Sequence, residues 1–203
     1  MDGTLFLDDS VLYLNHEFGV SDKLDEWHKK YYAGELSERD LNIMQMPILK
    51  RINYNEALEV LSRGRLMKNI DVGVQRLKEE GELKVAMLTF NPYQLLFESK
   101  FGIDCNISKT DEVSPDGRMV KTPKDFPKNK ITYLEDHCSK AGMELNQCIH
   151  VGEGDNDVPV FEQTGFSVAL NARKERVKNA ASISLETRDF DKVAKAILNN
   201  IQS

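Results

Sequence analysis

The chain has 203 residues, of which 40% are hydrophobic and 30% are charged, a balance typical of a globular protein. Its net charge of −6 argues against a nucleic-acid partner, because binding a phosphate backbone requires a basic surface. No apolar run approaches the roughly 18 residues of a membrane span, and no charged, then apolar leader opens the sequence. We therefore expect a cytoplasmic protein, monomeric or homodimeric, that binds neither nucleic acid nor membrane.

Residues 9–69 are predicted to form a helical insert, because they hold amphipathic stretches and no strong strand pattern. The acidic pair Asp8-Asp9 is expected to cap the first helix. We interpret the aromatic stripe of Trp27, Tyr31 and Tyr32 as packing rather than as a ligand cage, and Met44 and Met46 give the insert an apolar, methionine-lined character.

From about residue 70 onward, strands alternate with helices. Val72, Val74 and Leu77 are expected on one face of a helix that stops at Gly81. A buried strand at residues 83–88 should end at Thr89. Further on, Pro92 should open a helix that Gly102 closes, and residues 114–117 should form the tip of a small hairpin.

The last third of the chain continues this alternation. A helix at residues 130–141 should bury Ile131, Leu134 and Cys138, and strand 148–151 should lead into a glycine-rich loop. The remaining elements are expected as helix 158–163, strand 166–170, helix 173–179, strand 182–185 and helix 189–201. This order predicts an α/β fold, with a parallel-sheet core of residues 1–8 and 70–203 and an inserted cap of residues 9–69.

The cysteines and histidines show no pattern of a metal site. Three cysteines (Cys105, Cys138 and Cys148) suit reduced, buried thiols, since their number is odd. The histidines lack metal and catalytic-triad spacing; we place His28 on the surface of the insert and His150 beside the core.

Four polar segments stand where parallel strands end, and such ends gather at one edge of a sheet. They are Asp2-Gly3-Thr4, Thr89-Phe90-Asn91, the start of the helix at Lys130, and residues 153–157. Their carboxylates could hold Mg²⁺, which keeps several waters and one or two carboxylates. Their hydroxyl and backbone N–H groups could bind phosphate oxygens.

This set resembles the haloacid dehalogenase superfamily of phosphatases, in particular the helical-cap branch that includes the phosphoserine phosphatases. The resemblance implies a Rossmannoid core and Asp2 as general acid/base. It implies Lys130 as the charge-balancing cation, with Lys124 and Lys128 as competitors. It also implies Mg²⁺ ligands at Asp2, Glu153 and Asp157, and phosphate or substrate contacts from Gly3, Thr4, Thr89, Phe90, Asn91, Asn156 and Asp9.

The sequence departs from that family in two places. The family motif reads Asp-x-Asp-Gly-Thr, so its nucleophilic Asp would stand immediately before Met1, and the residues ahead of it would form a central strand. We therefore expect Met1 to be an internal methionine, with the nucleophile encoded upstream. The second departure is Glu153, which occupies the position of a metal-ligating Asp and would shift the metal or its waters.

The resemblance implies a Mg²⁺-dependent phosphatase that hydrolyses a small phosphorylated metabolite through an aspartyl-phosphate. Two alternatives stay open: an inactive phosphate- or metal-binding protein and a phosphotransferase of the same superfamily. The phosphoserine enzymes use a cap arginine for the substrate carboxylate, and residues 42–45 contain none. Arg39 or Arg51 could substitute, whereas an apolar cap favours a less acidic leaving group.

Overall fold

The computed structural model describes residues 1–94, 97, 100–107, 112–114, 116–117, 119–121 and 129–201. The chain divides into two compact units. The core unit comprises Met1–Leu7, Leu66–Lys109 and Pro127–Ser203, and the helical unit comprises Asp8–Arg65 and Thr110–Phe126. Among the described helices, none is both long and apolar enough to cross a membrane.

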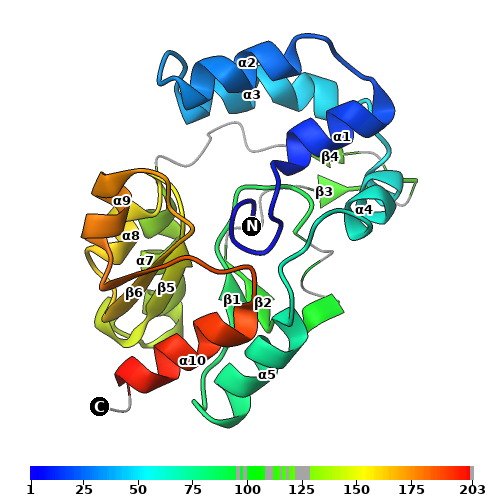
Figure 1. The fold of residues 1–203 in the computed structure, drawn as a ribbon. Coiled ribbons are helices and arrows are strands. Elements are labelled where there is room, and N and C mark those ends of the chain that lie inside the picture. The colour runs from blue at the N-terminus through cyan, green and yellow to red at the C-terminus, as the bar shows by residue number, and fades with distance from the viewer. Residues whose placement is uncertain are drawn as a thin grey trace. The chain divides into compact units, whose positions relative to one another are not determined.

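In the described part of the core unit, the parallel strands form two groups (Figure 1). Strand β1 (Ala86–Met87) pairs with β2 (Cys105–Asn106). Strands β5 (Ile149–Gly152), β6 (Phe166–Leu170) and β7 (Ile183–Leu185) form a second sheet in that order, with Gly152 opposite Ala169. The predicted α/β fold with parallel strands is therefore confirmed.

The strand predicted at residues 83–88 is shorter than expected. Its first half makes contacts that do not form a ladder, because the Asp104 side chain accepts the Val85 N–H at 2.8 Å while the Val85 carbonyl accepts the Asp104 N–H. Regular pairing therefore begins only at Ala86. The elements predicted after residue 130 agree with the structure to within two residues at each end.

Helices cover the sheets of the core unit. They are α5 (Ile70–Glu79), α7 (Lys130–Ala141), α8 (Val158–Phe161), α9 (Glu175–Ala180) and α10 (Phe190–Ile201), with a short 3₁₀ helix at Leu145–Gln147. As predicted, α7 buries Ile131, Leu134 and Cys138, which pack with Val160 of α8. This packing fixes the start of α7, where Lys130 lies.

Helices α5 and α10 pack so closely that a Cβ on Gly73 would stand only 2.7 Å from the Phe190 ring. The buried residues of α5 include Val74 and Leu77, as predicted, but Val72 is 45% exposed. That prediction was wrong because position 72 lies outside the i, i+3, i+4, i+7 series that starts at Ile70.

A cavity of about 160 Å³ lies in the core unit, lined by residues of both sheets. Residues 86–88 line it from the β1 segment and residues 149–151 from β5, and Met1 and Leu5 also line it. Helices α5 and α10 contribute Val74, Leu77, Phe190 and Ile197. Within the described part of the chain, β1 pairs only with β2 and β5 only with β6.

Over the residues that the structure describes, the helical unit contains four helices and a hairpin. The helices are α1 (Ser10–Phe18), α2 (Leu24–Tyr32), α3 (Glu38–Leu49) and α4 (Tyr54–Ser62). Strands β3 (Glu112–Val113) and β4 (Met119–Lys121) pair antiparallel, and the Gly117 N–H donates to the Ser114 carbonyl at 2.8 Å. The predicted hairpin is therefore confirmed. Asn53, which caps α4, also donates to the Asp116 carbonyl at 2.9 Å.

Candidate active site

The first segment of the predicted site is a tight turn at the start of the chain. The Met1 carbonyl accepts hydrogen bonds from the backbone amides of residues 4 to 6 at 2.8–3.2 Å. Gly3 has a φ of +68°, and a Cβ at this position would stand 2.5 Å from Oε2 of Glu153. The opening turn and the late acidic loop therefore lie in direct contact, and only glycine allows it.

The second segment reaches the same turn from the end of β1. The Asn91 side chain donates from Nδ2 to Oδ2 of Asp2 at 3.1 Å. Thr89 is buried, and its Oγ1 accepts the Asn91 N–H at 3.2 Å, which fixes the backbone between them. The ring of Phe90 packs edge-on against Tyr133, with centroids 5.7 Å apart.

The late loop is organised around the buried carboxylate of Asp157. One oxygen of Asp157, Oδ2, accepts the N–H groups of Glu153 and Gly154, both at 3.1 Å. A Cβ on Gly152 would lie 2.2 Å from the same carboxyl group, so glycine is required where β5 ends. Asp157 thus shapes the loop that presents Glu153 to the opening turn.

The other oxygen of Asp157 binds two cationic or ionisable side chains. Its Oδ1 accepts a hydrogen bond from Nζ of Lys130 at 2.7 Å and lies 2.8 Å from Nε2 of His150. Lys130 is buried at the first position of α7, where Asn129 caps the helix by accepting the Thr132 N–H. Lys124 and Lys128, the competitors of Lys130, lie outside the described residues.

His150 was predicted to lie beside the core, with no role in the site. It belongs to strand β5, whose buried positions are 150 and 152. Because side chains on one face of a strand recur every two residues, His150 points to the side on which Gly152 meets Asp157. Strand alternation was therefore the signal that could have linked His150 to the late loop.

The two carboxyl groups of the loop differ in electrostatic environment. Burial alone would raise the pKa of Asp157. The charge of Lys130, together with the hydrogen bond and charge of His150, lowers this pKa by more, so it lies well below its usual range. Burial raises the pKa of Glu153, and the charge of Asp157 adds to this, although the positive charges of the Met1 amino group, Lys130 and Arg173 oppose it. Glu153 is thus the carboxylate that would gain most from a cation.

Two salt bridges fix the middle of the loop. Asp155 lies within ion-pair distance of Lys174 and Arg176, at 2.5 and 2.8 Å, and both partners come from the segment around α9. Asn156 lies half-buried beside it. These exposed contacts join the loops that follow β5 and β6.

The residues present suit a hard cation with few protein ligands. Among the described residues, no group of three His, Cys, Asp or Glu could enclose a metal ion. Mg²⁺ does not need such a group, since it commonly takes one or two carboxylates and fills its octahedron with waters and substrate oxygens. Asp2 and Glu153, which the Gly3 contact brings into one place, offer oxygen donors of this kind.

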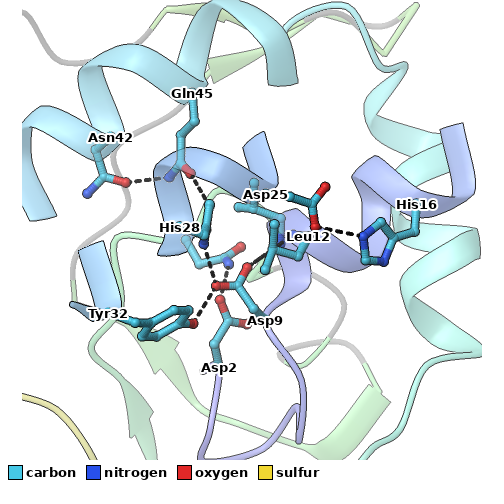
Figure 2. Close-up of polar contacts among 11 residues, drawn as sticks. Asp2, Asp9, Leu12, His16, Asp25, His28, Tyr32, Asn42 and Gln45 are labelled. Atoms are coloured by element: carbon cyan, nitrogen blue, oxygen red, sulfur yellow. Dashed lines mark hydrogen bonds and ion pairs between the residues drawn. The ribbon is translucent and has the colours of Figure 1, made fainter. Parts of the chain in front are cut away.

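In the helical unit, Asp9 stands at the start of α1 and caps it as predicted. Its Oδ1 accepts the N–H groups of Val11 and Leu12 at 3.0 and 3.1 Å. Its Oδ2 accepts the Tyr32 hydroxyl at 2.8 Å and lies 2.9 Å from Nδ1 of His28 (Figure 2).

Two predictions about these neighbours were wrong. His28 is 3% exposed, not at the surface, because its ring is enclosed where α2 meets Asp9 and α3. Tyr32 is 55% exposed rather than packed, since its hydroxyl reaches Asp9 at the end of α2.

Comparisons with known proteins point to one family of enzymes. The profile of the haloacid dehalogenase-like hydrolases matches residues 122–197. A phosphoserine phosphatase from Polaromonas sp. is 30% identical over 175 residues, covering 81% of this chain and 73% of that protein. One from Methanocaldococcus jannaschii is 24% identical, covering 97% of this chain and 94% of that protein. One from Archaeoglobus fulgidus is 25% identical, and this chain spans only 58% of its length.

Solved structures support the fold. A haloacid dehalogenase family hydrolase from Salmonella enterica serovar Typhi superposes with a TM-score of 0.80 at 20% identity, over 95% of this chain and 68% of the other. A substrate-bound phosphoserine phosphatase superposes with a TM-score of 0.76 at 22% identity, over 97% of this chain and 94% of the other. Together with the acidic loops at the strand ends, these matches show that the chain belongs to the haloacid dehalogenase-like hydrolases. Within that family it is a phosphoserine phosphatase-like member.

Proposed function

We propose that this protein hydrolyses a small phosphomonoester with Mg²⁺ through an aspartyl-phosphate intermediate, formed on the nucleophilic Asp of the family motif Asp-x-Asp-Gly-Thr. The observation that carries the proposal is the contact between Gly3 and the Glu153 carboxylate. It gathers the Asp2 turn, Asn91 and the loop held by Asp157 and Lys130 around one place. The name shared by the relatives, phosphoserine phosphatase, supports a phosphomonoester substrate.

The proposed reaction has two steps. In the first, a carboxylate oxygen of the nucleophile bonds to phosphorus, the bond from phosphorus to the leaving oxygen breaks, and Asp2 gives that oxygen a proton. In the second, Asp2 takes a proton from a water whose oxygen attacks phosphorus, and the bond to the nucleophile breaks with release of phosphate. Backbone amides of the opening turn, with Thr4, Thr89, Phe90, Asn91 and Asn156, are proposed to bind the phosphoryl group.

Asp2 and Glu153 are proposed to hold Mg²⁺, which when bound would neutralise the charge of the phosphoryl oxygens. Metal ligation by Asp157 stays a prediction. Its two oxygens bind Lys130, His150 and two backbone amides, so it could reach a metal only by giving up one of them. We propose that Asp157 mainly holds Lys130 in place to balance charge between nucleophile and phosphate.

The helical insert predicted at residues 9–69 is proposed to act as a cap that excludes water and selects the leaving group, with Asp9 in contact with the substrate. Arg51, one candidate for recognising a substrate carboxylate, is exposed, and the Arg39 side chain lies outside the described part. The three free thiols suit a reducing compartment, so we propose the cytoplasm as the site of action.

The test compares two extended chains. Each carries the same strand of about five apolar residues before Met1; one strand ends in Asp and its matched control ends in Asn. We expect the Asp form alone to release phosphate from a phosphomonoester panel with Mg²⁺ and to accumulate an acid-stable, hydroxylamine-sensitive phosphoprotein. Equal rates in the Asp and Asn forms would exclude the covalent route.

A second candidate is a phosphate- or metal-binding protein without turnover, and Glu153 at the position of the usual Asp favours it. Binding of Mg²⁺ and inorganic phosphate by the Asp form, with no hydrolysis of any ester, would support this alternative. A phosphotransferase is the third candidate. It would release the leaving group faster when a second alcohol is added as acceptor.

A further inference from the structure

Strand β5 places a buried histidine beside the late loop. His150 is 9% exposed, and its ring packs against the ring of Phe161, with centroids 5.5 Å apart. All four residues of β5 pair with β6, so the backbone that carries His150 is held over the whole length of the strand. From this fixed position, Nε2 of His150 lies 2.8 Å from Oδ1 of Asp157.

The acceptor decides where the histidine ring carries a proton. The pKa of Asp157 lies well below its usual range, so its side chain is an ionised carboxylate, which can only accept hydrogen bonds. Nε2 of His150 must therefore be the donor, since an unprotonated nitrogen at 2.8 Å would set its lone pair against those of the oxygen. The ring thus carries a proton on Nε2.

The four hydrogen bonds of Asp157 differ in what they can fix. The carboxyl group of an aspartate turns easily about its last torsion angle, so its orientation depends on its partners. Lys130 offers a rotatable ammonium group, and the amides of Glu153 and Gly154 belong to the loop that the carboxylate itself holds. Among these four partners, only His150 is a planar donor on a paired strand.

The orientation of this carboxylate affects two parts of the candidate site, both in the core unit. Oδ1 of Asp157 holds Nζ of Lys130, the proposed charge-balancing cation, at 2.7 Å. Oδ2 holds the loop whose Glu153 carboxylate lies against Gly3. A turn of the Asp157 carboxylate would therefore disturb the Lys130 contact and the loop together.

We propose that His150 is a positioning residue, whose Nε2–H sets the orientation of the Asp157 carboxylate and thereby the places of Lys130 and of the loop. In this role His150 contacts neither the substrate nor the reacting atoms. Its effect on catalysis rests on the function proposed above, whereas its effect on the loop does not.

Two substitutions and one control test the proposal. His150→Leu keeps an apolar side chain but removes the donor, and His150→Gln restores an N–H donor. The control is Ser167→Ala, because Ser167 lies opposite His150 on β6 and is also buried. This variant loses the hydrogen bond that Ser167 accepts from the Ser182 amide at 3.0 Å, and Ser167 makes no described contact with Asp157.

The first measurement is amide hydrogen exchange in the unmodified chain and in the three variants. In His150→Leu, we expect the Glu153 and Gly154 amides to exchange at least about tenfold faster relative to the amides of helix α10, because their acceptor is no longer fixed. His150→Gln should bring this ratio back toward that of the parent, and Ser167→Ala should leave it unchanged. Equal acceleration of the loop and of α10 in His150→Leu would mean a purely structural role and would overturn the proposal.

Two further measurements extend the test. ¹⁵N NMR of the unmodified chain should show a proton on Nε2 of His150, and an unprotonated Nε2 would overturn the proposal. In the Asp-extended chain, His150→Leu should lower kcat for a phosphomonoester at least about tenfold, whereas His150→Gln should recover it and Ser167→Ala should not change it. A kcat of His150→Leu equal to that of the parent would also overturn the proposal.

A failure of this inference can be told apart from a failure of the proposed function. If the Asp-extended parent hydrolyses no ester, the proposed function is refuted, and amide exchange and NMR still decide the role of His150. If the parent hydrolyses esters but the loop and α10 respond equally in His150→Leu, only the inference fails.

Discussion

The carboxylate of Glu153 lies directly against Gly3, which stands 150 positions earlier in the sequence. It leaves no room for a side chain at position 3. The contact is sterically severe, because a Cβ on Gly3 would meet three side-chain atoms of Glu153 within 2.9 Å. Position 3 also requires glycine for its backbone, since the φ of Gly3 is +68°, in the left-handed region. Both demands act at the place where the proposed metal ligands meet.

The first prediction separates these two demands. Gly3→Ala should destabilise the chain by about 2–4 kcal/mol, from the left-handed backbone and the displaced carboxylate. Gly142→Ala is the matched control, since Gly142 also lies in the core unit with a φ of +67° but has nothing within 4 Å of a Cβ. It should cost only about 1 kcal/mol. Urea unfolding of both variants measures the difference, and equal losses would mean that Glu153 moves aside freely.

The second prediction concerns the buried ion pair beneath the loop. Asp157→Asn leaves Lys130 and His150 without their carboxylate, and removing one partner of a buried pair costs roughly 3–5 kcal/mol. Asp155→Asn is the control, since it breaks two bridges that are largely exposed, each worth about 1 kcal/mol or less. Unfolding midpoints at pH 7 report both effects; similar small losses would show that water solvates Lys130.

The same pair has a defined pH dependence. The pKa of Asp157 is lower in the folded than in the unfolded chain, so its stabilisation is present above the ordinary carboxyl pKa of about 4. It is lost as the pH falls below that value. The stability gap between the parent and Asp157→Asn should therefore narrow from about pH 5 downward, and a gap that stays constant down to pH 2 would contradict this assignment.

The sequence could predict those parts of the fold that follow local periodicity. Helix α7 and strand β6 have the bounds expected from their apolar patterns, and the cap of α1 by Asp9 follows from its residue type. The strand before Thr89 could not be bounded in this way, because the side chain of Asp104 takes the Val85 amide out of the ladder. That contact joins residues far apart in sequence and leaves no local signal.

The site shows the same limit. Position at the ends of strands was enough to gather Asp2, Asn91 and the late loop, since topology places such ends together. The partners His150 and His28 were missed because a lone histidine in an apolar pattern gives no sign of which acceptor it meets. Their roles follow from tertiary contacts alone.

The third prediction concerns the buried Glu153 carboxylate. The pKa of this acid is raised on folding, so the folded chain loses stability as the pH rises from the ordinary value of about 4 through the raised pKa. Glu153→Gln removes the buried charge and should raise the Tm at pH 7 in EDTA. Mg²⁺ should raise the Tm of the parent and not that of the variant, because a bound ion stabilises only the folded state.

The exposed Glu162 provides the control for this experiment. Glu162→Gln should leave both the Tm in EDTA and the response to Mg²⁺ as in the parent. An equal Mg²⁺ response in Glu153→Gln would exclude Glu153 as a ligand. A lower Tm of that variant in EDTA would mean that the ionised carboxylate already has a sufficient cationic partner.

The last prediction concerns the thiols between α7 and β5. Sγ of Cys138 and Sγ of Cys148 lie 3.4 Å apart. Burial, together with the hydrogen bond and charge of Cys138, raises the pKa of Cys148 to about 12. At pH 8 its thiolate fraction is then on the order of a thousandfold below that of an ordinary thiol with a pKa of about 8.5, and the thiolate is the form that reacts.

Cys148 should therefore resist alkylation by iodoacetamide at pH 8 in the folded chain and react at the ordinary rate in urea. Mass spectrometry of the modified peptides measures both rates, and labelling of the folded chain within a factor of ten of the unfolded rate would show that the two sulfurs do not stay in contact.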